Sequence, residues 1–122
     1  MIKHPPADDT EATLAAIAYI PGLAPLVWLS LERGKPQYFL RYHVIHAVLL
    51  NIASLLALLA AAALGWVPSA TTTIYMVMGL AIVGTLVVAM FAHGMAAMQA
   101  YRKRLIVLPL LTPLYYRFFA QG

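Results

Sequence analysis

The chain contains no cysteine, and charged residues are scarce in it. The missing cysteine excludes a disulfide framework, a thiolate nucleophile and a sulfur-ligated metal site. Only 10% of the 122 residues are charged, whereas 63% are hydrophobic. A chain of this composition cannot cover an apolar core with a water-soluble surface, so we expect an integral membrane protein.

The charged residues also leave long gaps. No Asp, Glu, Lys or Arg occurs between Arg41 and Arg102, and two helices can each cross about 30 Å of hydrocarbon within a gap of that length. A third uncharged run precedes the gap, and a shorter one follows it. We therefore predict an all-α, polytopic membrane bundle of one domain, 1–122. Its parts are a polar tail at 1–11, long transmembrane helices at 12–31, 38–64 and 72–101, and a short C-terminal segment at 105–120 that is interfacial, re-entrant or a fourth crossing.

The flanking charges predict an orientation. Asp8, Asp9 and Glu11 precede the first run, which is unlike the positively charged start of an export signal, so we expect this run to be retained. Basic residues follow the first and third runs, and the turn after the second run has none. The positive-inside rule then places the basic loops in the cytoplasm and the N-terminus outside, and we expect a bacterial inner membrane. Because the basic residues serve topology, we expect no nucleic-acid partner.

The first run is interrupted by Pro21, Gly22 and Pro25. Proline removes a backbone donor and clashes with the preceding turn, so we expect a proline-kinked crossing helix. The alternative is a broken helix whose free carbonyls face an ion or substrate. That alternative requires a second broken segment, for which the run around Pro109 and Pro113 is the candidate.

Small and polar residues recur at three- and four-residue steps in the second and third runs, which places them on one helical face. Such faces allow close helix packing in membranes, so we predict a helix hairpin. Asn51 is expected to form a hydrogen bond across it. The face of the second run comprises His43, His46, Ala47, Leu50, Ser54, Ala57, Ala61 and Gly65, and that of the third comprises Gly79, Met90, His93, Gly94 and Ala97.

Three sequence blocks resemble one known family. They are the segment from Ala18 to Leu23, the segment from Arg41 to Ile52, and Gln99-Ala100-Tyr101-Arg102 with the later Leu108-Pro109-Leu110. Together they resemble the 20-kilodalton component of the chloroplast inner-envelope translocon and its small bacterial relatives. The resemblance implies a small helical membrane protein associated with protein transport.

Two positions depart from that family's pattern. His46 stands where the family usually has Gln, and the segment after Pro109 lacks the glycine often found there. The resemblance marks Arg41, His43, His46, Asn51 and Pro109 as motif or helix-packing positions. Ser54, Gly79 and Gly94 join them as predicted packing residues on the two faces.

His43, His46 and His93 are the candidates for chemistry. The first two are three residues apart on one face, and His93 lies toward the same membrane side, so the three imidazoles could converge. Imidazole ligates zinc, iron or the magnesium of chlorophyll. No intramembrane carboxylate accompanies them to orient a metal ligand. Interhelical hydrogen bonding is therefore the favoured interpretation, with chlorophyll, haem or metal binding and proton transfer as alternatives.

We predict a non-enzymatic protein, because no acid, base and nucleophile are brought together by these patterns. Ser69 and the threonines at 71–73 are expected to cap a helix start. The aromatic residues near the basic ends are expected to lie at the headgroup level. The favoured function is a small helical subunit, related to assembly or translocation, in a larger complex with other membrane proteins. A homo-oligomeric pore or carrier and a pigment-binding subunit are the alternatives.

Overall fold

The computed structural model describes residues 7–31 and 37–119, and these ranges contain helices and no strand. Two helices are long and the others are short. In chain order they are α1 (Asp9–Ala18), α2 (Ala24–Leu29), α3 (Tyr38–Ala63), the 3-10 turn η1 (Leu64–Trp66), α4 (Thr72–Tyr101) and α5 (Leu111–Phe118).

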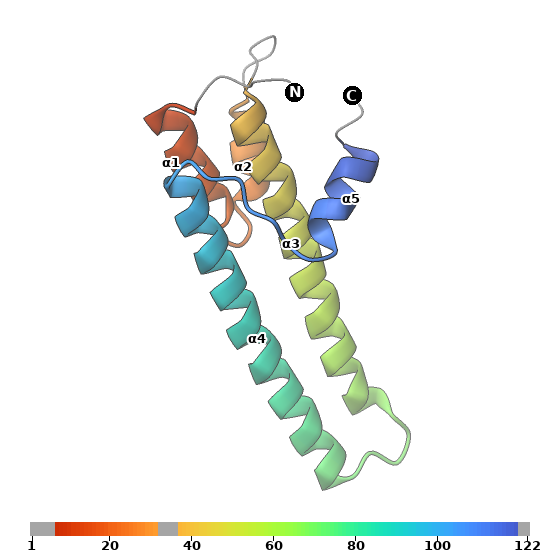
Figure 1. Cartoon of the computed structure of the whole chain (residues 1–122). Helices are drawn as coiled ribbons and strands as arrows, with labels where there is room; N and C mark the ends of the chain where they lie inside the picture. The colour runs from red at the N-terminus through yellow and green to blue at the C-terminus, as the bar shows by residue number, and fades with distance from the viewer. Residues whose placement is uncertain (1–6, 32–36, 120–122) are drawn as a thin grey trace.

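The long helices α3 and α4 form an antiparallel hairpin (Figure 1). Their 26 and 30 residues correspond to lengths of about 39 and 45 Å, and each contains an 18-residue window with a mean hydropathy of 2.4. Both are therefore long and apolar enough to span a membrane. The predicted hairpin is confirmed, and so is the presence of these two long helices.

The α3–α4 turn closes one end of the hairpin, which we call the closed end; the start of α3 and the end of α4 form the open end. At the closed end the Thr71 hydroxyl accepts a hydrogen bond from the Ile74 N–H, so the predicted helix cap is present at Thr71. Gly65 allows close approach there, since a Cβ at this position would lie 2.9 Å from the sulfur of Met78.

The first run is not one long crossing helix. It forms α1 and α2, which pack against each other and are joined by a turn at 19–23 (Figure 1). Gly22 has φ +85 in this turn, a conformation that glycine adopts without a side-chain penalty. Helices of ten and six residues are only about 15 and 9 Å long, too short to cross the hydrocarbon. The expected third long crossing is therefore not found.

The start of α1 lies at the open end of the hairpin. A capping box between Asp8 and Glu11 begins this helix, and the Asp9 carboxylate lies 2.8 Å from the ammonium of Lys103, just after α4. This contact places the N-terminal part of the described chain beside the basic segment at 102–104. The prediction that the two lie on opposite sides is wrong, because the first run turns back at Gly22 instead of crossing. Arg33 and Lys35 lie outside the described residues.

The C-terminal segment begins with irregular backbone and ends in α5, which packs against α3. Leu110 precedes this helix with φ 69 and ψ −39, and the Leu111 N–H donates to the Pro109 carbonyl at 2.8 Å. This is a γ-turn in its strained, positive-φ form. The eight residues of α5 are about 12 Å long, so the fourth-crossing alternative is not realised in this helix.

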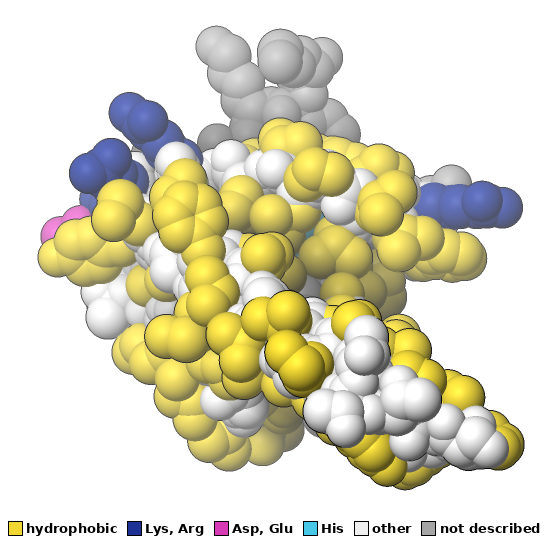
Figure 2. Space-filling model, turned by 90° about the horizontal axis from the view of Figure 1, so that it is seen from below, with side chains coloured by type: hydrophobic (Ala, Val, Ile, Leu, Met, Phe, Trp, Pro, Cys, Tyr) yellow, Lys and Arg dark blue, Asp and Glu magenta, His cyan; other side chains and the backbone are white. Residues whose placement is uncertain are grey.

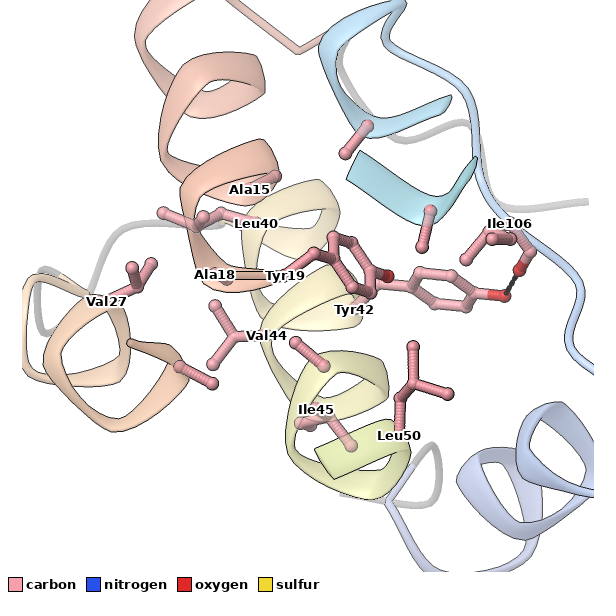
Figure 3. Packing of buried hydrophobic residues seen from close by; sticks show 14 of the residues in the cluster. Ala15, Ala18, Tyr19, Val27, Leu40, Tyr42, Val44, Ile45, Leu50 and Ile106 are labelled. Carbon is pink, nitrogen blue, oxygen red and sulfur yellow. Dashed lines mark hydrogen bonds between the residues drawn. The ribbon is translucent and has the colours of Figure 1, made fainter. Parts of the chain in front are cut away.

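The buried core lies at the open end, where α1, α2 and α5 surround the first half of α3 (Figure 3). Ten of the 26 residues of α3 are buried, and only Ala61 among them lies beyond Leu50. In α4 the buried residues are His93, Ala96 and Ala100. The closed half of the hairpin therefore exposes apolar side chains, and Figure 2 shows a largely hydrophobic surface with the visible Lys and Arg at its margin.

Candidate functional site

His43 is fully buried and connects three parts of the chain. The Tyr19 hydroxyl lies 2.8 Å from its Nδ1, and its Nε2 lies 2.9 Å from the carbonyl oxygen of Arg104. A carbonyl can only accept, so a neutral imidazole must donate from Nε2 and accept at Nδ1 from the tyrosine. His43 on α3 thus holds the end of α1 and the backbone that follows α4.

His46 is also fully buried and connects α3 to α5. Its Nδ1–H donates to the Tyr42 carbonyl at 2.9 Å, which leaves Nε2 to accept from the Thr112 hydroxyl at 3.0 Å. The same hydroxyl accepts from the Leu108 N–H at 2.8 Å. Each of these polar groups therefore has a defined partner in the network.

Tyr42 completes this arrangement. Its hydroxyl donates to the Ile106 carbonyl at 2.6 Å, the bond drawn in Figure 3, and its ring stacks on His46 at 4.1 Å. We call the side chains of Tyr19, Tyr42, His43, His46 and Thr112 the tyrosine–histidine network. The network supplies hydrogen bonds to the carbonyls of Arg104 and Ile106, in a segment that has no helical ladder of its own.

His93 lies apart, in the interface between α4 and α3. Its Nδ1–H donates to the Ala89 carbonyl at 2.7 Å, and its Nε2 lies 3.1 Å from Oδ1 of Asn51. Nε2 of a neutral imidazole is then an acceptor, so this contact is a hydrogen bond when the oxygen and nitrogen of the Asn51 amide are exchanged and the NH₂ group faces the ring. The predicted interhelical hydrogen bond of Asn51 is present.

The three histidines do not form one centre. Within the described ranges, no group of three His, Cys, Asp or Glu side chains is placed to hold a metal ion. The network takes up both ring nitrogens of His43 and His46, and His93 bonds to Asn51 and Ala89. A metal or tetrapyrrole would have to displace one of these hydrogen bonds.

The other predicted packing residues differ in how far they are buried. Ser54 is half-buried beside α4, and Arg41 is exposed, with its guanidinium 5.9 Å from the centre of the Trp28 ring.

Gly79 and Gly94 meet nothing within 4 Å at the position of an added Cβ, so neither supports a close helix contact within this chain. Met90 and Gly94 are exposed, because the interface follows His93, Ala96 and Ala100 around the helix. Pro109 is exposed in the turn before α5.

Sequence reasoning missed the roles of Tyr19, Tyr42 and Thr112. The aromatic residues near the basic ends were expected to lie at the headgroup level, and two of them, Tyr42 and Tyr115, are buried within the chain, with 1% and 3% of their surface exposed. The centres of these two rings are 4.8 Å apart, where α5 packs against α3. The block from Arg41 to Ile52 contains Tyr42, which gave a signal for that residue, whereas no pattern in the sequence pointed to Thr112.

The electrostatics at the open end centre on the contact between Asp9 and Lys103. A hydrogen bond from Lys103 and its positive charge hold the pKa of Asp9 below its ordinary value of 3.8. The same carboxylate raises the pKa of Lys103 above 10.5. Both side chains are at the surface, so this is an exposed ion pair.

An open groove of about 550 Å³ runs between α3 and α4 in the middle of the hairpin. Most of its lining side chains are small, and they come from both helices. They include Ala53, Ser54, Ala57, Ala81, Gly84 and Ala89. We call this feature the hairpin groove.

Comparison with known proteins gives no match to a family model, a curated protein or a solved structure. The resemblance to the chloroplast translocon component therefore stays a prediction that rests on the three sequence blocks.

Proposed function

We propose that this chain is an integral membrane protein that acts by contact, as a small helical subunit of a larger membrane assembly. The observation that carries the proposal is the exposure of its two long helices. In the most apolar 18-residue window of each helix, 17% of α3 and none of α4 is buried within the chain. A core helix of a water-soluble protein would be mostly covered, and neither helix lies near the N-terminus as an export signal would.

The polar side chains favour a structural role over catalysis. Those at membrane depth form hydrogen bonds to one another or to backbone carbonyls, and those bonds allow irregular backbone to lie in an apolar environment. A reaction would need a nucleophile, an acid and a base around one substrate position. We therefore propose a protein with no turnover of its own. The resemblance favours protein transport in a bacterial inner membrane as its setting.

The hairpin groove is the proposed contact for a partner subunit, and we propose that an apolar transmembrane helix of another subunit occupies it. Small residues let two helix backbones approach closely in lipid. Gly84 lines the groove, and an added Cβ there meets nothing within 4 Å inside this chain. A larger side chain at this position would therefore extend into the groove without a clash inside this chain.

The test is the protein mass, without the bound detergent, of the particle extracted in mild detergent. We expect a particle heavier than the 13.3 kDa chain alone, and we expect Gly84→Ile to release the single chain because the branched side chain fills the groove. Gly94→Ile is the matched control, since Gly94 is also in α4 and free of contacts but does not line the groove. A wild-type protein that is extracted only as the 13.3 kDa chain would contradict the subunit proposal.

A further inference from the structure

A second groove lies on the opposite side of α3 from α4, at the open end. Its volume is about 440 Å³, within the usual range of roughly 300–1,000 Å³ for small-molecule pockets. Side chains of α2 and α3 line it together with Phe119, and all of them are hydrophobic. They are Pro25, Trp28, Leu29, Ile45, Val48, Leu49 and Phe119.

The positive charge of Arg41 lies near one end of this groove. Arg41 lies one helical turn before Ile45, and its guanidinium is over the ring of Trp28, which is itself part of the lining. Among the described residues Arg41 forms no ion pair. The charge is thus exposed and lies over the ring of Trp28.

The depth of the groove matches a lipid. From Arg41, the lining residues Ile45 to Leu49 lie about 6 to 12 Å further along α3, in the direction of the closed end. Arg41 is in the first turn of a helix that is long enough to span the bilayer, so the guanidinium lies at headgroup level. An acyl chain that starts below the headgroup would therefore enter a fully apolar lining.

We propose that this groove binds an anionic phospholipid, with its phosphate at Arg41 and one acyl chain against Ile45, Val48 and Trp28. The inference rests on the proposed membrane location. Arginine is suited to this task because its planar guanidinium can donate two parallel hydrogen bonds to a phosphate while it remains stacked on an aromatic ring.

Trp28 provides a direct reporter, because the chain has only one other tryptophan and Trp66→Phe removes it. The protein is placed in phosphatidylcholine vesicles that contain a minor fraction of phosphatidylglycerol, with bromine on the acyl chains of one lipid or the other. Bromine quenches an indole that it touches. We expect brominated phosphatidylglycerol to quench Trp28 about fivefold more than its share of the lipid predicts.

Two variants separate this site from general attraction to a basic surface. In Arg41→Gln, each lipid should quench Trp28 in proportion to its share of the bilayer. Arg102→Gln removes the same charge at the same end of the molecule, but away from the groove, and should retain the preference; Arg41→Lys should retain most of it. If both lipids quench Trp28 in proportion to their share of the bilayer in the Trp66→Phe protein, or if Arg41→Gln and Arg102→Gln have an equal effect, the proposal is wrong.

A third reporter distinguishes failure of this site from failure of the membrane location. Leu80→Trp, with both native tryptophans changed to Phe, places an indole on the exposed face of α4, where Leu80 is 72% exposed. Brominated phosphatidylcholine should quench it. If neither Leu80→Trp nor Trp28 is quenched, the membrane location is wrong. If only Leu80→Trp is quenched, protein covers the groove and the lipid site is wrong.

Discussion

The backbone from Lys103 to Leu110 lies outside the helices, and two of its carbonyls accept hydrogen bonds from side chains of α3. Tyr42 and His43 donate to the carbonyls of Ile106 and Arg104, and Thr112 accepts from the Leu108 N–H. In lipid there is no water to replace a lost hydrogen bond, which makes these residues structural determinants of the fold. These buried side chains are polar because they form hydrogen bonds to that backbone.

Thr112→Val tests this role at one residue. Valine has nearly the same shape as threonine, but it cannot donate to His46 or accept from the Leu108 N–H. We expect the free energy of unfolding to fall by about 1 kcal/mol, because a part-buried donor and a buried acceptor both lose a partner. Unfolding in mixed micelles, followed by circular dichroism, measures the change.

Thr112→Ser is the matched control for that substitution, since serine keeps the hydroxyl and loses one methyl group. It should lie closer to the unmodified protein than Thr112→Val does. If the two variants were destabilised equally, packing and not hydrogen bonding would account for the role of Thr112.

At the scale of elements, the start of α5 carries a strained backbone. Leu110 adopts φ 69, which places its Cβ close to neighbouring backbone atoms, and its side chain is 81% exposed. The sequence departs from the resembled family near this position, where a glycine often follows Pro109. The departure thus coincides with a conformation that glycine would adopt more easily.

Leu110→Gly should therefore stabilise the protein, by about 1 kcal/mol, through relief of this strain. The midpoint of thermal unfolding in detergent measures it. Leu110→Ala removes the same exposed side chain but keeps a Cβ, and we expect it to give no comparable gain. A midpoint for Leu110→Gly below that of Leu110→Ala would mean that the γ-turn is not strained in the folded protein.

The helices were predictable from the sequence to different degrees. The long uncharged gap fixes α3 and α4, because a run of that length and hydropathy has few alternatives in a membrane. The break at Gly22 was not predictable, since Pro21 and Pro25 fit both a kink and a reversal. Contacts from distant residues decide between these, among them Tyr19 to His43 and Asp9 to Lys103.

The candidate site was predictable in its members and not in its connections. His43 and His46 stand out as polar residues in an apolar run, and Asn51 was correctly expected to reach α4. The partners that connect the two histidines to other elements are a carbonyl and hydroxyls more than 20 residues away in the sequence, those of Arg104, Tyr19 and Thr112. No local pattern encodes such pairs, because they depend on how the open end packs.

At the scale of the whole molecule, the ion pair between Asp9 and Lys103 joins the start of α1 to the segment that follows α4. The pKa of Asp9 is lowered in the folded state, so the pair stabilises the fold above the ordinary pKa of an aspartate. That contribution is lost as the pH falls through the lowered pKa of Asp9. We expect Lys103→Gln to raise the pKa of Asp9 toward 3.8, as measured by the NMR shift of its carboxyl carbon during a pH titration.

Arg102→Gln serves as the control for that titration, because it also removes one positive charge from the same segment without removing the 2.8 Å contact. It should change the pKa of Asp9 less than Lys103→Gln does. An Asp9 pKa that is the same in the unmodified protein and in Lys103→Gln would mean that α1 does not begin beside the end of α4.

The central claim is that α3 and α4 cross a membrane while α1 and α2 turn back, so that both ends of the described chain share one side. The chain has no native cysteine, so single cysteines at Thr10, Ser69 and Arg102 can be labelled in intact cells without background. We predict that Thr10→Cys and Arg102→Cys are protected together from an impermeant reagent, and that only Ser69→Cys reacts from outside. Labelling of Thr10→Cys from outside, together with Ser69→Cys, would restore a third crossing and contradict this account.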